Sequence, residues 1–214
     1  SAAAGARDPT VARLTRASLA EAVDLLCDRD ADLARVVARH GPPSFWSRPP
    51  GFATLVYIIL EQQVSLASAR ATYLRLQELL PAFTPEAFVT LSDEVLRSAG
   101  VSRQKARYSR LVAEAALDGT LPLARLGRMR DDEVRVALTA ITGIGNWTAD
   151  VYMMAALRRR DLWPIGDLAL VKAIMELKGH EERPPAEQLE ALGERYRPVR
   201  SVAALIYWRH YLQR

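Results

Sequence analysis

A Gly-Ile-Gly turn lies in the middle of Leu138-Thr-Ala-Ile-Thr-Gly-Ile-Gly-Asn-Trp-Thr-Ala-Asp-Val-Tyr152, between two segments with helical periodicity. We expect Asp131 or Asp132 to cap the first helix and Asn146 to cap the second. Glycines at such a turn permit positive φ and leave no Cβ in the way of an approaching partner. The free N–H groups of the second helix then offer a seat for a phosphate oxygen. Taken alone, Gly-Ile-Gly favours an ordinary turn between helices.

The residues around the turn favour a more specific interpretation. Leu138-x-x-Ile-x-Gly-Ile-Gly-x-Trp-Thr-Ala149 resembles the helix-hairpin-helix of the base-excision DNA glycosylase superfamily. In that superfamily a loop rich in Pro and Gly and then an Asp follow the second hairpin helix, and Trp163-Pro-Ile-Gly-Asp167 supplies both, with Asp167 placed 24 residues after Gly143. Within the superfamily the chain is most similar to the 3-methyladenine DNA glycosylase II group, from about Gly51 to the C-terminus.

The composition fits a helical globular protein with a polyanionic partner. The chain has 214 residues, 50% of them hydrophobic and 7% aromatic, and a formal net charge of +4. Cys27 is the only cysteine, so the chain cannot build the four-cysteine iron–sulfur cluster that some members of the resembled superfamily carry. No apolar run is as long as a membrane span, and Ser1–Pro9 lacks the apolar core of a signal peptide. We therefore expect a cytoplasmic protein, associated with the bacterial nucleoid.

The order of helix and loop signals predicts an all-α fold of about ten helices without a sheet. Ser18-Leu-Ala-Glu21 is a capping-box pattern for the first helix. We expect two helical lobes with a cleft between them. One lobe combines residues 1–64 with about 168–214, and the other, about 65–167, carries the hairpin at 138–152 and the Asp loop. The first fifty residues are too short and too helical for the N-terminal β-rich domain of some relatives.

Asp167 has two possible roles. Gly166-Asp167-Leu168 before a helix is an ordinary N-cap, and the resemblance also makes Asp167 the catalytic carboxylate. Cleavage of an N-glycosidic bond builds positive charge on C1′ of the sugar, which a neighbouring carboxylate stabilises. Bifunctional members of the superfamily place a Lys two residues after the second hairpin glycine, where this chain has Trp147. The resemblance therefore implies a monofunctional enzyme that leaves an abasic site.

The resemblance also implies a base pocket with aromatic walls. A flipped base needs stacking partners, and a positively charged alkylated purine gains cation–π attraction from an indole ring. Trp147 and Trp208 match positions that line this pocket, and Tyr152 and Trp163 are candidates for its edge. Packing in the core is the alternative for these residues.

DNA-binding residues are expected in two segments. The hairpin candidates are Gly143, Ile144, Gly145 and Thr148. The second segment is the junction between two predicted helices, with the candidates Gln62, Gln63 and Ser65. In the resembled family the middle residue of this junction, here Gln63, fills the gap that a flipped base leaves, whereas the residues alone indicate only a polar break between helices.

A third basic segment is ambiguous. Arg103, Lys105, Arg107 and Arg110 form either a solvated helix face or a set of phosphate contacts, and both interpretations stay open.

No cofactor is expected to be required. Hairpins of the resembled kind commonly hold one Na⁺ or K⁺ through backbone carbonyls, and the matching carbonyls are those of Thr139, Ile141 and Gly143. The three histidines, His40, His180 and His210, are scattered along the chain and do not predict a transition-metal site.

The leading hypothesis is a monofunctional DNA glycosylase of the 3-methyladenine type, acting in base excision repair as a monomer on duplex DNA that carries alkylated bases. The alternatives are a non-catalytic helix-hairpin-helix module that only binds DNA, and a glycosylase for deaminated or mismatched bases. The Asp loop and the aromatic positions favour the enzyme over the binding module, because a binding module needs neither.

Overall fold

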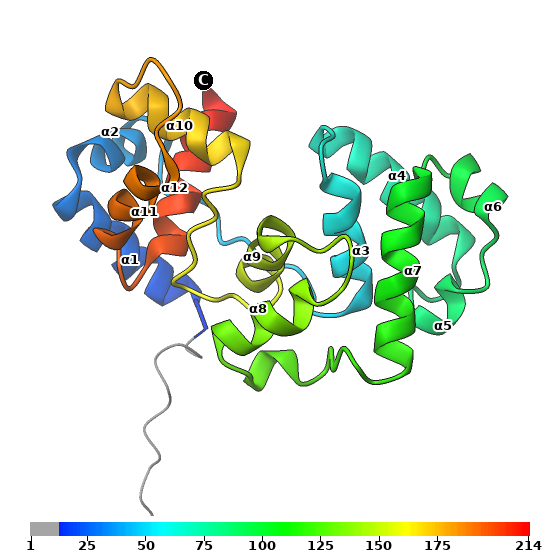
Figure 1. Ribbon diagram of the computed structural model, residues 1–214. Coiled ribbons are helices and arrows are strands. Elements are labelled where there is room, and N and C mark those ends of the chain that lie inside the picture. Colours follow the sequence, from blue (N-terminus) through cyan, green and yellow to red (C-terminus); the bar gives the residue numbers. More distant parts are fainter. Residues whose placement is uncertain (1–12) are drawn as a thin grey trace, which may run out of the picture. The chain divides into compact units, whose positions relative to one another are not determined.

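The computed structural model describes residues 13–214 and confirms the all-α prediction over that range (Figure 1). Its regular structure there consists of twelve α-helices and a short 3₁₀ helix, Leu126–Arg128, together with an isolated β-bridge between Arg13 and Arg159. Across these residues, no helix combines the length and the apolar character that a membrane crossing requires. The expectation about Ser1–Pro9 falls outside the described residues.

The chain divides into two compact units. The first unit combines the described residues up to Ser47 with Met153–Arg214, and the second unit is Arg48–Tyr152. The predicted lobes separate at residues 64 and 167, so both observed boundaries lie earlier in the chain. As a result, Asp167 belongs to the unit of the C-terminal helices and not to the unit that carries the hairpin.

In the first unit, α12 lies at the centre of the packing. It contacts α1, α2 and α10, and its residues Val202, Ala203 and Ile206 are fully buried. Burial of one aliphatic side chain the size of Val or Ile contributes about 1.5–3 kcal/mol. The helices of this unit are α1 (Arg16–Arg29), α2 (Ala31–His40), α10 (Leu168–Lys178), α11 (Ala186–Glu194) and α12 (Arg200–Gln213).

A buried polar network joins three parts of the first unit. Asp30 caps α2, and its Oδ2 accepts hydrogen bonds from Nζ of Lys178 at 2.7 Å and from the hydroxyl of Tyr196 at 2.6 Å. The Tyr196 hydroxyl also lies 2.8 Å from that of Tyr207. Burial raises the pKa of Asp30, but the hydrogen bonds from Lys178 and Tyr196 outweigh it, so this pKa lies below its ordinary value. The network was not predicted from the sequence.

In the second unit, α3 is the buried central helix that the apolar run over Phe52–Gln63 predicts. It spans Phe52–Glu61 and packs against α4 and α7, and eight of its ten residues are buried. The other helices of this unit are α4 (Leu66–Leu79), α5 (Pro85–Phe88), α6 (Asp93–Ser98), α7 (Arg103–Leu117) and α8 (Asp131–Thr139). The helix α9 (Asn146–Ala155) begins here and ends in the first unit.

Most predicted helix caps are confirmed. Ser, Thr and Asp residues that precede helical segments in the sequence are expected N-caps. Side-chain oxygens of six of them accept hydrogen bonds from backbone N–H groups at helix starts, and these residues are Asp30, Ser65, Thr84, Ser92, Ser102 and Asp167. Three predictions are wrong. At α9, Asn146 is the first helical residue and not the cap, because the carbonyl of Gly145 accepts the N–H of Ala149 at 3.0 Å.

At α1 the capping box uses Thr15 with Ser18 as its third helical residue, and not Ser18 with Glu21. At α8 the cap is Arg130, whose N–H donates to the carboxylate of Glu133 at 2.8 Å. Asp131 and Asp132 instead lie in the first turn of α8, where their negative charges interact favourably with the positive end of the helix dipole.

Candidate functional site

Asp167 lies at the end of the Trp163-Pro-Ile-Gly loop and caps α10. Its backbone N–H donates to the carbonyl of Pro164 at 2.9 Å, which closes the loop. Its Oδ1 accepts the N–H of Leu170 at 2.7 Å, and the residue is half-buried. The N-cap prediction is therefore confirmed, and the cap fixes the direction in which the carboxylate points.

Trp208 provides a second donor to the same carboxylate oxygen. Nε1 of its indole ring, on α12, donates to Oδ1 of Asp167 at 2.9 Å. The structure thus brings together two residues that the sequence assigns to one site, although they are 41 positions apart in the chain. A hydrogen bond to a charged group is shorter and stronger than one between neutral groups, so this contact restricts both side chains.

Trp46 is a neighbour of this pair that the sequence did not single out. Its ring meets the ring of Trp208 edge to face, with the centroids 5.6 Å apart and the planes at 90°. Both tryptophans are half-buried. The pair Phe45-Trp46 within a loop rich in Pro and Ser was the available signal, since large aromatic side chains in such a loop need a packing partner.

Two predicted pocket residues are core residues instead. Trp163 is 9% exposed, its Nε1 donates to the carbonyl of Leu189 at 2.8 Å, and its ring packs edge to face on Tyr196. Tyr152 is fully buried, and its hydroxyl accepts the N–H of Gly51 at 3.0 Å. These partners satisfy both polar groups, so the structure does not support either residue at the edge of a base pocket.

In the second unit, Gly143 forms the tight turn of the hairpin. Its φ is +93°, and an added Cβ would lie 2.1 Å from Cγ of Tyr108 on α7. Gly145 differs on both counts, because its φ is not in the left-handed region and an added Cβ would meet no atom within 4 Å. The positive φ that the sequence predicts for this turn therefore applies to Gly143 alone, and Gly145 is an exposed surface position.

Gln62 holds the hairpin against the end of α3. Its Nε2 donates to the carbonyl of Gly143 and to Oγ1 of Thr148, both at 3.0 Å. Thr148 is 2% exposed and Ile144 is 3% exposed. The side chains of Gln62, Thr148 and Ile144 are therefore engaged inside the unit, and the expectation that these three residues bind DNA stays a prediction. On this side of the turn, Gly145 and Asn146 are the exposed residues.

Gln63 and its neighbours protrude between α3 and α4. Gln63 is exposed and has a φ of +55°, a conformation that costs a residue with a side chain about 1–2 kcal/mol. Strain of this kind often marks a functional position. Val64 and Leu66 are exposed as well, and Ser65 caps α4 by accepting the N–H of Ser68 at 3.2 Å. The geometry suits a side chain that enters DNA, and that role of Gln63 stays a prediction.

The carbonyls predicted to hold a monovalent cation are partly engaged. The carbonyl of Ile141 accepts the N–H of Ile144 at 3.0 Å, and that of Gly143 accepts Nε2 of Gln62 at 3.0 Å. A carbonyl oxygen has two lone pairs, so each retains one for a cation. Among residues 13–214, no group of three His, Cys, Asp or Glu side chains is arranged to bind a metal ion.

Trp147 is half-buried and follows Asn146, the first residue of α9. It lies two residues after Gly145, at the position where the sequence predicts an indole in place of a lysine amine. Its role as a wall of the base pocket stays a prediction.

Comparisons with known proteins place this geometry in a family. Residues 56–198 match the family model described as "HhH-GPD superfamily base excision DNA repair protein". An alkylbase DNA glycosidase-like protein from Schizosaccharomyces pombe is 31% identical over 126 residues, which cover 58% of this chain and 59% of that protein. The chain spans about half the length of the curated relatives of this kind, 59% of one and 44% of another.

Two solved structures are similar over most of the chain. A DNA-3-methyladenine glycosidase from Bacillus halodurans is 33% identical with a TM-score of 0.75, and the match covers 90% of this chain and 89% of that one. The 3-methyladenine DNA glycosylase of Schizosaccharomyces pombe, solved with abasic DNA, is 26% identical with a TM-score of 0.81, covering 88% and 95%. The helical fold, the hairpin and the family match agree, and the chain belongs to the HhH-GPD superfamily of base excision DNA repair proteins.

Proposed function

We propose that this protein is a monofunctional DNA glycosylase of base excision repair. It hydrolyses the N-glycosidic bond of alkylated purines such as 3-methyladenine and 7-methylguanine, after the base has flipped out of duplex DNA, and leaves an abasic site. The observation that carries the proposal is the carboxylate of Asp167, whose Oδ1 accepts hydrogen bonds from Leu170 N–H and from the indole N–H of Trp208. Relatives with a 3-methyladenine glycosylase name support the reaction class.

The proposed reaction needs a fixed negative charge beside the sugar. When the bond between C1′ and the base nitrogen breaks, its electron pair leaves with the base and positive charge develops on C1′. The carboxylate of Asp167 stabilises that charge, and water then forms the new bond to C1′ and releases a proton to the carboxylate or to solvent. The two N–H donors on Oδ1 hold the carboxylate in place without moving during the reaction.

The absence of a lyase step follows from Trp147. A lyase needs an amine that forms a Schiff base with C1′, and the residue two positions after Gly145 is an indole. Lys172 is an exposed amine on α10, the helix that Asp167 caps. It is therefore the residue to examine if a covalent adduct is found.

The preference for alkylated purines rests on indole rings and on the chemistry of the lesions. An alkylated purine carries positive charge, and an electron-rich indole attracts it by about 0.5–2 kcal/mol, depending on how far the pair is desolvated. Trp208 is half-buried beside Asp167, and Trp147 is half-buried in the second unit. We propose that Trp208 stacks on the flipped base beside Asp167, and that duplex DNA is the partner of a monomeric enzyme.

A lesion panel tests the proposal. Methylated duplex DNA and duplexes that each contain one hypoxanthine, uracil or mismatch are incubated with the protein, and released bases and alkali-sensitive sites are measured. We expect release of 3-methyladenine and 7-methylguanine, with strand breaks that appear only after alkaline treatment. If the protein binds DNA but releases no base, the remaining hypothesis is a non-catalytic DNA-binding module. If it releases only hypoxanthine, uracil or mismatched bases, the hypothesis of a glycosylase for deaminated or mismatched bases is favoured.

Borohydride trapping tests the monofunctional assignment separately. Incubation with lesion DNA and borohydride is expected to yield no covalent protein–DNA adduct. A trapped species would contradict the assignment, and its loss in Lys172→Met would identify the amine.

A further inference from the structure

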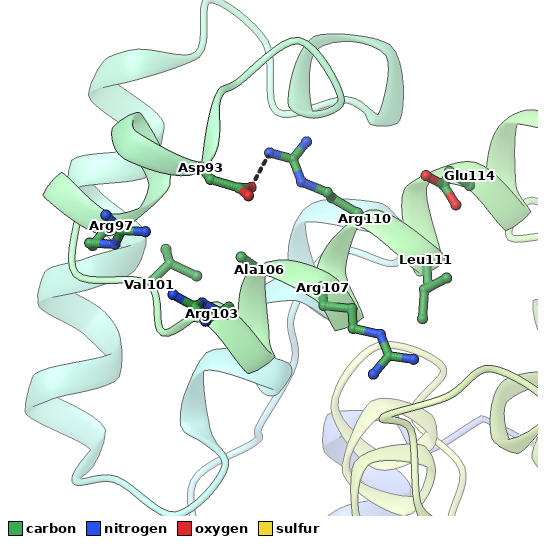
Figure 2. Close-up of a pocket in the computed structure, with 9 residues that line it drawn as sticks. All are labelled: Asp93, Arg97, Val101, Arg103, Ala106, Arg107, Arg110, Leu111 and Glu114. Atoms are coloured by element: carbon green, nitrogen blue, oxygen red, sulfur yellow. Dashed lines mark hydrogen bonds and ion pairs between the residues drawn. The ribbon is translucent and has the colours of Figure 1, made fainter.

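A basic depression lies between α6 and α7 in the second unit (Figure 2). It has a volume of about 300 Å³, and the buried residues Val101 and Ala106 are part of its lining. Arg97 of α6 and Arg103 and Arg107 of α7 are among the residues that line it (Figure 2). The DNA-binding roles proposed above do not use it.

The structure divides the four basic residues of α7 into two pairs. Nζ of Lys105 donates to the carbonyl of Leu60 at 2.7 Å, and burial lowers the pKa of this lysine. The guanidinium of Arg110 donates to the carbonyl of Leu91 at 2.6 Å and to Asp93 at 3.0 Å. These two residues therefore hold the fold of the unit together. The other two, Arg103 and Arg107, are exposed.

The cationic residues of the depression exceed the acidic ones. Asp93 already forms an ion pair with Arg110. Of the charged residues that line the depression, this leaves one carboxylate, Glu114, against the three guanidinium groups of Arg97, Arg103 and Arg107. None of these three guanidinium groups forms an ion pair with another residue of 13–214. Arg103 and Arg107 are four positions apart on one helix face, where like charges repel by about 0.2–0.5 kcal/mol. Such an arrangement is stabilised when an external anion lies between the groups.

The same end of α7 contacts both segments that are expected to meet DNA. The ring of Tyr108, next to Arg107, lies where a Cβ on Gly143 of the hairpin would be, and its hydroxyl accepts Nε2 of Gln104 at 2.8 Å. Lys105 binds the carbonyl of Leu60, close in sequence to Gln63. The depression lies on the other side of α7, toward α6, so this one helix joins its basic side chains to the hairpin turn and to the end of α3.

We propose that Arg97, Arg103 and Arg107 form a second phosphate-binding site, which binds the DNA backbone outside the segment that the hairpin contacts. Guanidinium groups suit this ligand because their planar fork donates two parallel hydrogen bonds to a phosphate. The site adds affinity for any duplex, damaged or intact, and reads no sequence. This inference depends on the proposed function in one respect, namely that DNA is the partner of the protein.

The test compares two double variants that each remove two positive charges. Arg103→Gln/Arg107→Gln changes the depression, and Arg35→Gln/Arg39→Gln changes two exposed arginines with the same spacing on α2 of the first unit. Binding of an undamaged duplex is measured by fluorescence anisotropy over a range of salt concentrations. Each lost phosphate contact lowers the slope of log K against log salt by about 1. The depression variant is therefore expected to lower the slope by about 2, and the α2 variant to leave it unchanged.

Two further measurements sharpen the result. Arg103→Lys/Arg107→Lys keeps the charges and is expected to keep the slope, which separates a charge effect from a change in folding that thermal melts would also report. A scan with single neutral methylphosphonate linkages is expected to find a position that weakens the wild-type protein and not the depression variant. If no such position exists, or if both Gln variants have the same slope, the site does not bind DNA.

A free anion is the alternative ligand, and titration with inorganic phosphate distinguishes it. Phosphate binding that is lost in Arg103→Gln/Arg107→Gln, together with an unchanged salt slope for DNA, would overturn the proposal. Base release by the wild-type protein is measured independently. A protein that releases bases but shows no slope change contradicts only the second site, and one that shows the slope change without base release contradicts only the proposed reaction.

Discussion

The indole Nε1 of Trp208 donates a hydrogen bond of 2.9 Å to Oδ1 of Asp167, the same oxygen that accepts the N–H of Leu170 at the start of α10. The contact joins the last helix of the chain to the cap of α10 within the first unit. One aromatic residue therefore both orients the carboxylate and presents a ring beside it. Trp46 in turn supports the ring of Trp208 edge to face.

Asp167→Asn is expected to remove most of the excision activity and to leave the fold intact. The amide oxygen can still accept the N–H of Leu170, but the charge that meets C1′ is lost. Electrostatic contributions of this type are worth roughly 10²–10³ in rate. Single-turnover base release from methylated DNA measures the effect, and thermal melts and binding to undamaged DNA are the controls. Turnover at the wild-type rate would exclude Asp167 from catalysis.

Trp208→Phe is expected to slow excision about tenfold to a hundredfold, because a hydrogen bond to a charged group contributes about 1.5–3 kcal/mol. The ring that stacks remains, so binding of lesion DNA should change less than the rate. Combining the change with Asp167→Asn provides the control. If Trp208 acts through the Asp167 carboxylate, Trp208→Phe has little further effect in that background, whereas equal losses in both backgrounds would show an independent role.

Gly145→Ala is expected to keep the stability of the protein and to weaken binding to all duplex DNA. The added methyl group meets no protein atom within 4 Å, and it lies where a phosphate would approach the hairpin. Equilibrium binding to intact and lesion-containing duplexes checks the prediction. A loss confined to lesion DNA would indicate that this turn belongs to the base pocket.

Gly143→Ala is the matched control for that experiment. Its Cβ would lie 2.1 Å from Cγ of Tyr108 and its φ of +93° is unfavourable for a side chain, so the unfolding free energy should fall. The left-handed conformation alone costs about 1–2 kcal/mol. Tyr108→Ala in the same chain should recover the part of the loss that comes from the clash.

Trp147→Ala is expected to reduce excision of cationic lesions more than that of neutral ones. Both classes lose stacking, on the order of 1–3 kcal/mol per base, and only the cationic base also loses about 0.5–2 kcal/mol of cation–π attraction. The measurement is the ratio of wild-type to variant rates for 7-methylguanine and for hypoxanthine in single turnover. Equal ratios would show that Trp147 contributes only packing or plain stacking.

Lys178→Met is expected to destabilise the first unit by about 3–5 kcal/mol at neutral pH, because Asp30 stays buried without its ion-pair partner. The pKa of Asp30 in the folded protein lies below its ordinary value. The ion pair between Asp30 and Lys178 therefore contributes its full stabilisation at pH values above that ordinary pKa. This stabilisation is lost as the pH falls through the lower pKa of the folded state. Urea unfolding should therefore show a difference between variant and wild type that narrows in acid, and Lys172→Met on the exposed face of α10 should show no such difference.

Local signals in the sequence determined the helices, six of their caps and the hairpin turn. These features depend on residues three or four positions apart, as when Oδ1 of Asp167 accepts the N–H of Leu170. The nearly continuous run of apolar residues over Phe52–Gln63 likewise identified α3 as a buried helix. The wrong assignments at Ser18 and at Asp131 arose where another residue within three positions takes the cap, Thr15 at α1 and Arg130 at α8.

Only the tertiary structure decided which polar and aromatic side chains are engaged inside the fold. Gln62 reaches Thr148 across 86 positions, Lys178 reaches Asp30 across 148, and Trp208 reaches Asp167 across 41. No local pattern specifies such pairs, because burial and hydrogen bonding between distant segments depend on how the helices pack. For the same reason Trp163 and Tyr152, which the sequence could not distinguish from pocket residues, became core residues whose polar groups bind backbone atoms.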